Sequence, residues 1–123
     1  MRFVLPKPLL RMSLAPAYGD PAFLSDALTA RYHDLMLAPG SREALIARMQ
    51  QSVLIDPRPL LRSIRAPTLL LGGEADAMIP LANSGDYLKE MNGATLVSLP
   101  GVGHLPHEEA AQESITSVRA FLK

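Results

Sequence analysis

Two short apolar runs, each followed by a glycine-containing loop, constrain the fold of this chain most. Thr68–Leu71 leads into a loop that ends at Asp76, and the run over residues 94–99 leads into a loop that ends at His104. Continuous apolar runs of this kind are typical of strands that are buried on both faces. The residues between them predict one helix, and a strand–helix–strand crossover in a single sheet makes the two strands parallel.

This arrangement predicts where the two ionisable residues lie. The carboxyl ends of parallel strands share one edge of the sheet, which is where open α/β sheets place their ligands. We therefore expect Asp76 and His104 to emerge side by side. A carboxylate beside a histidine is two thirds of a hydrolytic triad, so these are the candidate catalytic residues.

The first half of the chain predicts helices. Residues 1–19 contain several prolines and no clear period, so we expect them to be irregular apart from about one helical turn. Further on, helices are expected to begin at four cap-type positions, Asp20, Ser25, Ser41 and Asp56. The fold class is therefore α/β, with a helical segment over 1–64 and a βαβα portion over 65–123 that contains two parallel strands.

Composition excludes several functional classes. Twelve basic and twelve acidic residues leave no net charge, so the chain lacks the basic surface that nucleic acid requires. No apolar stretch approaches the roughly 20 residues of a membrane span. We expect a cytoplasmic protein with neither nucleic acid nor membrane as a partner. Cysteine is absent, which rules out disulfide and thiolate chemistry.

The residues around the two candidate positions resemble a known family. Residues 64–80 resemble the penultimate core strand of the α/β-hydrolase fold with its acid-bearing loop, and residues 92–106 resemble the last strand with its histidine-bearing loop. Residues 20–64 are similar, less specifically, to the helical cap. The resemblance implies that Asp76 orients His104, and that His104 is the general base that takes a proton from a serine or from water.

The chain departs from the family pattern upstream of these residues. It contains no G-x-S-x-G nucleophile elbow and no early strand with an oxyanion-hole loop. We therefore expect a C-terminal fragment of an α/β-hydrolase that is inactive alone. In the complete protein the resemblance implies hydrolysis of a small, largely apolar substrate without a cofactor. Esters are the first expectation, and C–C bond, epoxide and haloalkane cleavage stay open.

Simpler interpretations of the same residues remain. Asp76 and His104 could serve only as turn residues. His104, His107 and Glu108 could suggest a metal site, but Pro106 interrupts the helix that ligands three positions apart would need. We expect no metal there, and we expect Glu108 or Glu109 to stabilise the N-terminus of the last helix through its dipole.

A non-catalytic role is the alternative function. Two strands alone form a marginal sheet, and an uncovered apolar edge promotes association. The chain could therefore be an interaction module that associates with itself or with a partner through an exposed sheet edge. It could also be a truncated gene product with no role of its own.

Overall fold

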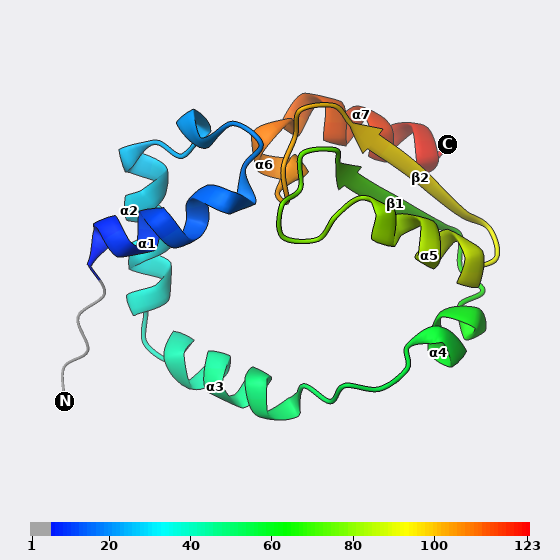
Figure 1. Ribbon diagram of the computed structural model, residues 1–123, viewed down its shortest axis with the longest axis horizontal. Coiled ribbons are helices and arrows are strands. Elements are labelled where there is room, and N and C mark those ends of the chain that lie inside the picture. Colours follow the sequence, from blue (N-terminus) through cyan, green and yellow to red (C-terminus); the bar gives the residue numbers. More distant parts are fainter. Residues whose placement is uncertain (1–5) are drawn as a thin grey trace.

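The computed structural model describes residues 6–123 and shows a series of helices followed by a βαβα unit (Figure 1). None of the helices in this range combines the length and the apolar composition that crossing a bilayer requires. In chain order the elements are α1 (Lys7–Leu14), the 3-10 turns η1 (Ala15–Ala17) and η2 (Pro21–Phe23), α2 (Asp26–Leu37), α3 (Ser41–Gln51), α4 (Arg58–Ser63), β1 (Thr68–Gly73), α5 (Ala82–Glu90), β2 (Ala94–Leu99), α6 (Pro106–Glu109) and α7 (Ala111–Phe121).

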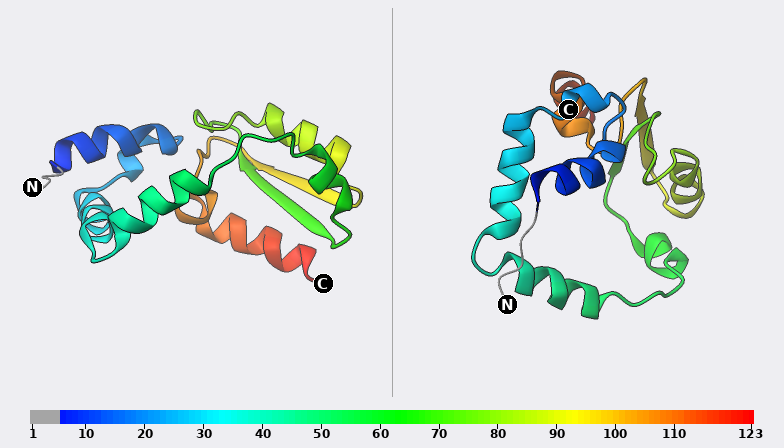
Figure 2. Two further views of the ribbon diagram at one scale, coloured as in Figure 1. Left: turned by 90° about the horizontal axis from the view of Figure 1, so that it is seen from below. Right: turned by 60° about the vertical axis from the view of Figure 1, so that its left-hand side comes forward.

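The two strands pair in parallel, as the sequence predicts. Thr68 lies opposite Ala94 at one end of the ladder, and Gly73 lies opposite Leu99 at the other. Helix α5 forms the crossover between the strands. Figure 2 shows the sheet between α5 on one side and α7 on the other. The carboxyl ends of both strands therefore reach the same edge of the sheet.

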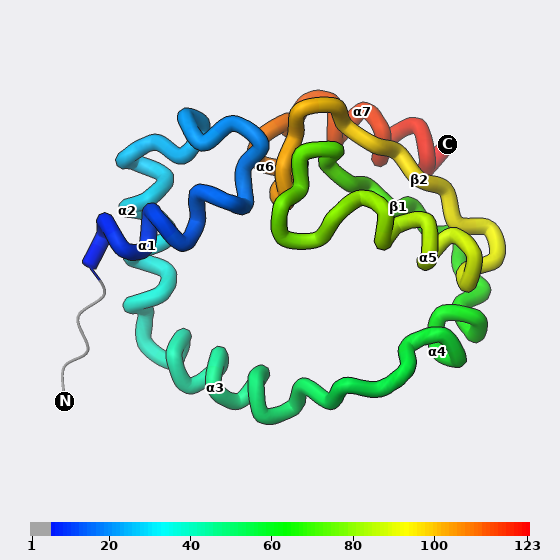
Figure 3. Tube along the Cα trace, in the orientation of Figure 1, coloured from blue at the N-terminus to red at the C-terminus, as the bar shows by residue number. Residues whose placement is uncertain are grey.

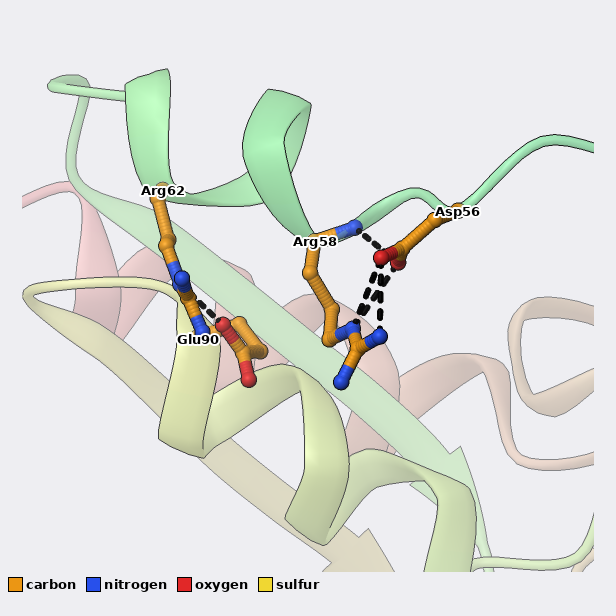
Figure 4. A network of polar contacts seen from close by, with 4 residues as sticks. All are labelled: Asp56, Arg58, Arg62 and Glu90. Carbon is orange, nitrogen blue, oxygen red and sulfur yellow. Dashed lines mark hydrogen bonds and ion pairs between the residues drawn. The ribbon is translucent and has the colours of Figure 1, made fainter.

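The segment over residues 41–63, which we call the arm, comprises α3, α4 and the stretch between them. Figures 1 and 3 show it running in an open arc from the end of α2 round to α5. At its far end Arg62 donates a hydrogen bond to Glu90 of α5, and Asp56 pairs with Arg58 (Figure 4). Its large apolar side chains other than Leu61 are exposed, and Leu54 is exposed completely.

The buried core of the first half is small and lies away from the arm. Leu24 has no exposed surface, and Ala17 and Tyr18 are buried beside it. Leu14, Leu28 and Leu105 pack against this cluster. Because Leu105 follows His104 directly, the core attaches the loop that carries His104 to the first helices.

Helix α1 corrects the expectation that the first 19 residues are irregular; residues 1–5 of that range lie outside the described part. The helix has Pro6 at its N-cap and Pro8 in its first turn. Proline is tolerated at these positions because the missing N–H would have no partner within the helix. The prolines therefore mark where this helix begins and do not prevent it.

The predicted caps are confirmed in part. Ser25 accepts a hydrogen bond from the Leu28 amide at the start of α2, and Asp20 accepts one from the Ala22 amide, but it caps only a 3-10 turn. Ser41 does not cap α3. Gly40, with a φ of 82°, is the N-cap, and the Ser41 hydroxyl donates to the Leu35 carbonyl at the end of α2. Asp56 accepts a hydrogen bond from the Arg58 amide as α4 begins.

Candidate active site

The loops that follow the two strands are held together through their backbones. The Glu74 amide donates to the Leu99 carbonyl at 3.0 Å, and the Ala75 amide donates to the Val102 carbonyl at 2.9 Å. A Cβ atom at Gly73 would lie 2.1 Å from the Val102 oxygen, so only glycine permits this approach. The glycine that ends β1 thus sets the spacing of the two loops that carry Asp76 and His104.

The structure brings Asp76 and His104 into direct contact, as the sequence predicts. His104 Nδ1 lies 2.9 Å from Asp76 Oδ2. The second carboxylate oxygen, Oδ1, accepts hydrogen bonds from the Met78 and Ile79 amides, both at 2.8 Å. Two backbone amides therefore fix one oxygen of the carboxylate, and the other oxygen faces the imidazole.

The surroundings of Asp76 favour its ionised form. Burial raises the pKa of this carboxyl, but the hydrogen bonds from the Ile79 amide, from His104 and from the Met78 amide outweigh it, and the pKa lies below its ordinary value. The Asp76 side chain is 10% exposed, whereas that of His104 is 32% exposed. Asp76 is thus a shielded anion, and the imidazole keeps a face for a reacting group.

The His104 loop is also attached to the turn that follows α1. The His104 amide donates to the Ala17 carbonyl at 2.7 Å. A Cβ atom at Gly103 would lie 2.5 Å from the Gly19 nitrogen, so the two backbones pack with no side chain between them. We call residues 17–20 and 101–109 together the joint. Sequence reasoning missed the contribution of residues 17–20, since no local pattern connects them to a loop far along the chain.

Glu108 and Glu109 lie in the first turn of α6, and they also make tertiary hydrogen bonds that the sequence does not predict. Glu108 Oε2 accepts hydrogen bonds from the Tyr18 hydroxyl at 2.8 Å and from the Tyr32 hydroxyl at 3.0 Å. Glu109 accepts hydrogen bonds from backbone amides of the joint. Both carboxylates therefore make tertiary contacts, and their effect on the helix dipole stays a prediction.

A small hollow lies at the edge of the sheet where the two strands end. This hollow of about 190 Å³ lies beside the acid–histidine pair, and it is lined by Leu71, Gly72, Gly73, Asp76, Ile79, Leu81, Ser84, His104 and Pro106. Within residues 6–123 no three His, Cys, Asp or Glu side chains lie close enough together to hold a metal ion. The chemistry that the site itself offers is proton transfer at His104.

Comparison with known proteins gives the family. Residues 1–115 match the family described as alpha/beta hydrolase. The chain belongs to the α/β-hydrolase family. One curated relative, the pyrrolizixenacetamide deacetylase of Xenorhabdus hominickii, is 30% identical over 80 residues, which are 65% of this chain and 30% of the relative.

Solved α/β-hydrolase structures share the fold. A serine hydrolase involved in carbazole degradation superposes with a TM-score of 0.83 at 19% identity, over 98% of this chain and 48% of its own. A meta-cleavage product hydrolase from Pseudomonas fluorescens superposes with a TM-score of 0.82 at 18% identity, over 98% of this chain and 46% of its own. The chain thus spans about half of these structures and less than a third of the deacetylase.

Proposed function

We propose that this chain is the C-terminal part of an α/β-hydrolase, with a helical cap over 1–64 and the last core portion over 65–123. In the complete enzyme Asp76 orients His104, which acts as the general base in hydrolysis of a small, largely apolar substrate. The observation that carries the proposal is the 2.9 Å contact between His104 Nδ1 and an Asp76 carboxylate that two backbone amides already hold.

The proposed chemistry is proton transfer at the second ring nitrogen of His104. Nε2 takes the proton of an attacking serine or water, and the imidazolium that forms is stabilised by the ionised Asp76. The same proton then passes to the leaving group. The nucleophile and the oxyanion hole come from the N-terminal portion of the enzyme, because the sequence contains no G-x-S-x-G.

One relative supports an acyl substrate, because it is named a deacetylase. Two structural neighbours are named hydrolases, which supports hydrolysis without indicating the bond that is cleaved. Removal of an acetyl group is acyl transfer to water, which needs a base placed as His104 is placed here. An ester is therefore the first substrate class to test.

The test is reconstitution with the missing portion. The chain is mixed with a separately expressed N-terminal portion of an α/β-hydrolase that carries G-x-S-x-G, and hydrolysis of p-nitrophenyl acetate is followed. Turnover is expected only with both pieces. His104→Ala is expected to lower kcat by about 10³-fold or more. His107→Ala, an exposed histidine three positions further on, is the control and should leave turnover unchanged.

Two results contradict the proposal. One is association of the two pieces, shown by size-exclusion chromatography, without any ester hydrolysis. The other is turnover that survives His104→Ala. Either result would count against His104 as the general base of ester hydrolysis.

One observation favours a non-catalytic alternative. Among residues 6–123, β1 and β2 pair only with each other, so each strand has an unpaired outer edge. Such an edge could join a second copy or another protein. Light scattering that shows a compact monomer at micromolar concentration would argue against this alternative. Limited proteolysis that reveals no protected core would instead indicate a truncated product with no independent role.

A further inference from the structure

Two adjacent glutamates in α6 bind different parts of the molecule. Glu109 accepts three backbone hydrogen bonds: Oε2 accepts from the Gly103 amide at 2.7 Å and from the Gly19 amide at 3.1 Å, and Oε1 accepts from the Asp20 amide at 2.8 Å. Among residues 6–123, Glu108 accepts only from the hydroxyls of Tyr18 and Tyr32. The Glu109 carboxylate therefore bridges two backbone segments, since Gly19 and Gly103 are 84 residues apart along the chain.

Those segments hold the backbone that leads into His104. The Gly103 amide donates to Glu109, and the His104 amide donates to the Ala17 carbonyl at 2.7 Å. A Cβ atom at Gly19 would lie 2.1 Å from the Gly101 oxygen, so the turn at residues 17–20 lies directly against the loop. The backbone that aims the imidazole at Asp76 thus depends on this turn and on the carboxylate that binds both.

The Glu109 carboxylate can bind these backbone amides strongly because it is charged. Burial raises the pKa of Glu109, but the amides of Asp20, Gly103 and Gly19 outweigh that effect, and the pKa lies below its ordinary value. An ionised carboxylate accepts stronger hydrogen bonds than a neutral group does. No other side chain hydrogen-bonds the amides of Gly19 and Gly103 among the described residues.

We propose that Glu109 is a positioning residue for His104. It binds the peptide before His104 to the Gly19–Asp20 turn and so keeps the imidazole within hydrogen-bond distance of Asp76. This inference rests on the proposed function, since positioning matters for turnover only if His104 is the base. Glu108 differs in its partners, because its carboxylate accepts from the side-chain hydroxyls of Tyr18 and Tyr32 and from none of these backbone amides.

The experiment measures the hydrogen bond of the His104 ring in the full chain. With ¹⁵N-labelled histidine, the Nδ1 proton that faces Asp76 is followed by NMR, and its exchange with solvent is measured. Asp76→Asn identifies the signal by removing it. Glu109→Ala is expected to speed its exchange about tenfold or more, the factor that corresponds to losing one hydrogen bond to a charged group. Glu109→Gln, of equal size, should give a smaller increase.

Glu108→Gln is the matched control. It changes the neighbouring carboxylate on the same helix and should leave the His104 signal unchanged. The proposal is overturned if Glu109→Gln and Glu109→Ala both leave that signal as it is in the unchanged chain. If Glu109→Ala does not fold, Glu109→Gln alone decides, because it keeps the volume and removes only one acceptor and the charge.

The two proposals fail in different ways. In the reconstituted enzyme Glu109→Gln is expected to lower kcat by about tenfold with KM unchanged, since only the orientation of the base is affected. Turnover that survives His104→Ala would refute the proposed function whatever the NMR shows. An unchanged His104 signal in the Glu109 variants would refute the positioning role even if His104 proves essential.

Discussion

The joint and the arm are built in opposite ways. In the joint, residues from both ends of the chain pack backbone against backbone and leave no room for a Cβ atom at Gly19 or Gly103. In the arm, every residue from 42 to 60 is exposed, including Leu45, Met49 and Leu54. Backbone groups of the joint hydrogen-bond within the joint, whereas the arm exposes apolar side chains to solvent.

The difference separates the contacts that the chain forms within itself from the apolar surface that it leaves exposed. His104 belongs to the joint, and Asp76 contacts it from the loop after β1, so the described residues form this contact by themselves. The arm and the outer edges of the sheet present surfaces that fit burial against another part of a hydrolase. We therefore expect changes in the joint to act on the isolated chain, and changes in the arm to act mainly on association.

Gly103→Ala is expected to have the largest effect. The new Cβ would lie 2.5 Å from the Gly19 nitrogen and 2.6 Å from the Ala17 oxygen, and both neighbours are backbone atoms that cannot rotate away. We expect a loss of about 3 kcal/mol or more in the free energy of unfolding, at or above the upper end for overpacking. Urea unfolding followed by circular dichroism measures it.

Gly85→Ala is the control for this change. The site lies on α5, and an added Cβ meets nothing within 4 Å. Alanine is the better helix former, so this variant should gain about 0.5–1 kcal/mol. Equal effects of the two substitutions would show that the joint is not closely packed.

Leu24→Ala and Leu54→Ala form the second test. Leu24 has no exposed surface, and its truncation should cost about 2 kcal/mol, the lower end for a buried leucine, because a small core can relax around the gap. Leu54 is fully exposed, so its truncation should change stability by less than about 0.5 kcal/mol. It should instead weaken binding to the N-terminal portion, which titration calorimetry can detect. A large loss of stability in Leu54→Ala would mean that the arm is packed in solution.

We expect Asp76 and Glu109 to make the stability of the fold sensitive to acid. The pKa values of Asp76 and Glu109 lie below their ordinary values, so these groups hold protons more weakly in the folded chain than in the unfolded one. Their contribution to stability is complete above the unfolded values of about 4 and is lost as the pH falls through the folded values. The urea midpoint should therefore fall between pH 6 and pH 3, and less steeply in Glu109→Gln. The prediction is contradicted if the urea midpoint falls equally steeply with pH in the unchanged chain and in Glu109→Gln.

Asp56→Asn should have the smallest effect. Its ion pair with Arg58 lies in the arm, where both side chains are about half exposed or more. Exposed pairs of this kind contribute little because water and salt screen them. We expect no measurable change in the thermal midpoint. A fall as large as that of Leu24→Ala would remove the distinction between the two regions.

The sequence predicts those parts of the fold whose signals are local. The apolar runs, the glycines that end them and the helix between them predict two parallel strands, and from these follows the contact between Asp76 and His104. The signals are strong because a buried strand requires a continuous apolar run. The catalytic role of the pair remains a prediction.

What the sequence does not predict depends on distant partners. Glu109 in the first turn of a helix indicates a dipole contact, yet the structure gives its carboxylate three backbone amides in the joint. Gly19 carries no sign of its approach to Gly103, because the two residues meet only in the folded chain. Pro6 and Pro8 suggest irregular structure when they are counted, but their positions at the start of α1 make them compatible with a helix.

The two amides that bind Asp76 Oδ1 have a consequence for the protonation of the imidazole. If asparagine replaces this aspartate, its carbonyl must occupy the Oδ1 position, because only an oxygen can accept from Met78 and Ile79. Its NH₂ group then faces His104, whose Nδ1 has to become an acceptor. The neutral ring is driven to the other tautomer, with its hydrogen on Nε2, where it cannot receive one from a nucleophile. The turn after β1 thus decides which ring nitrogen is basic.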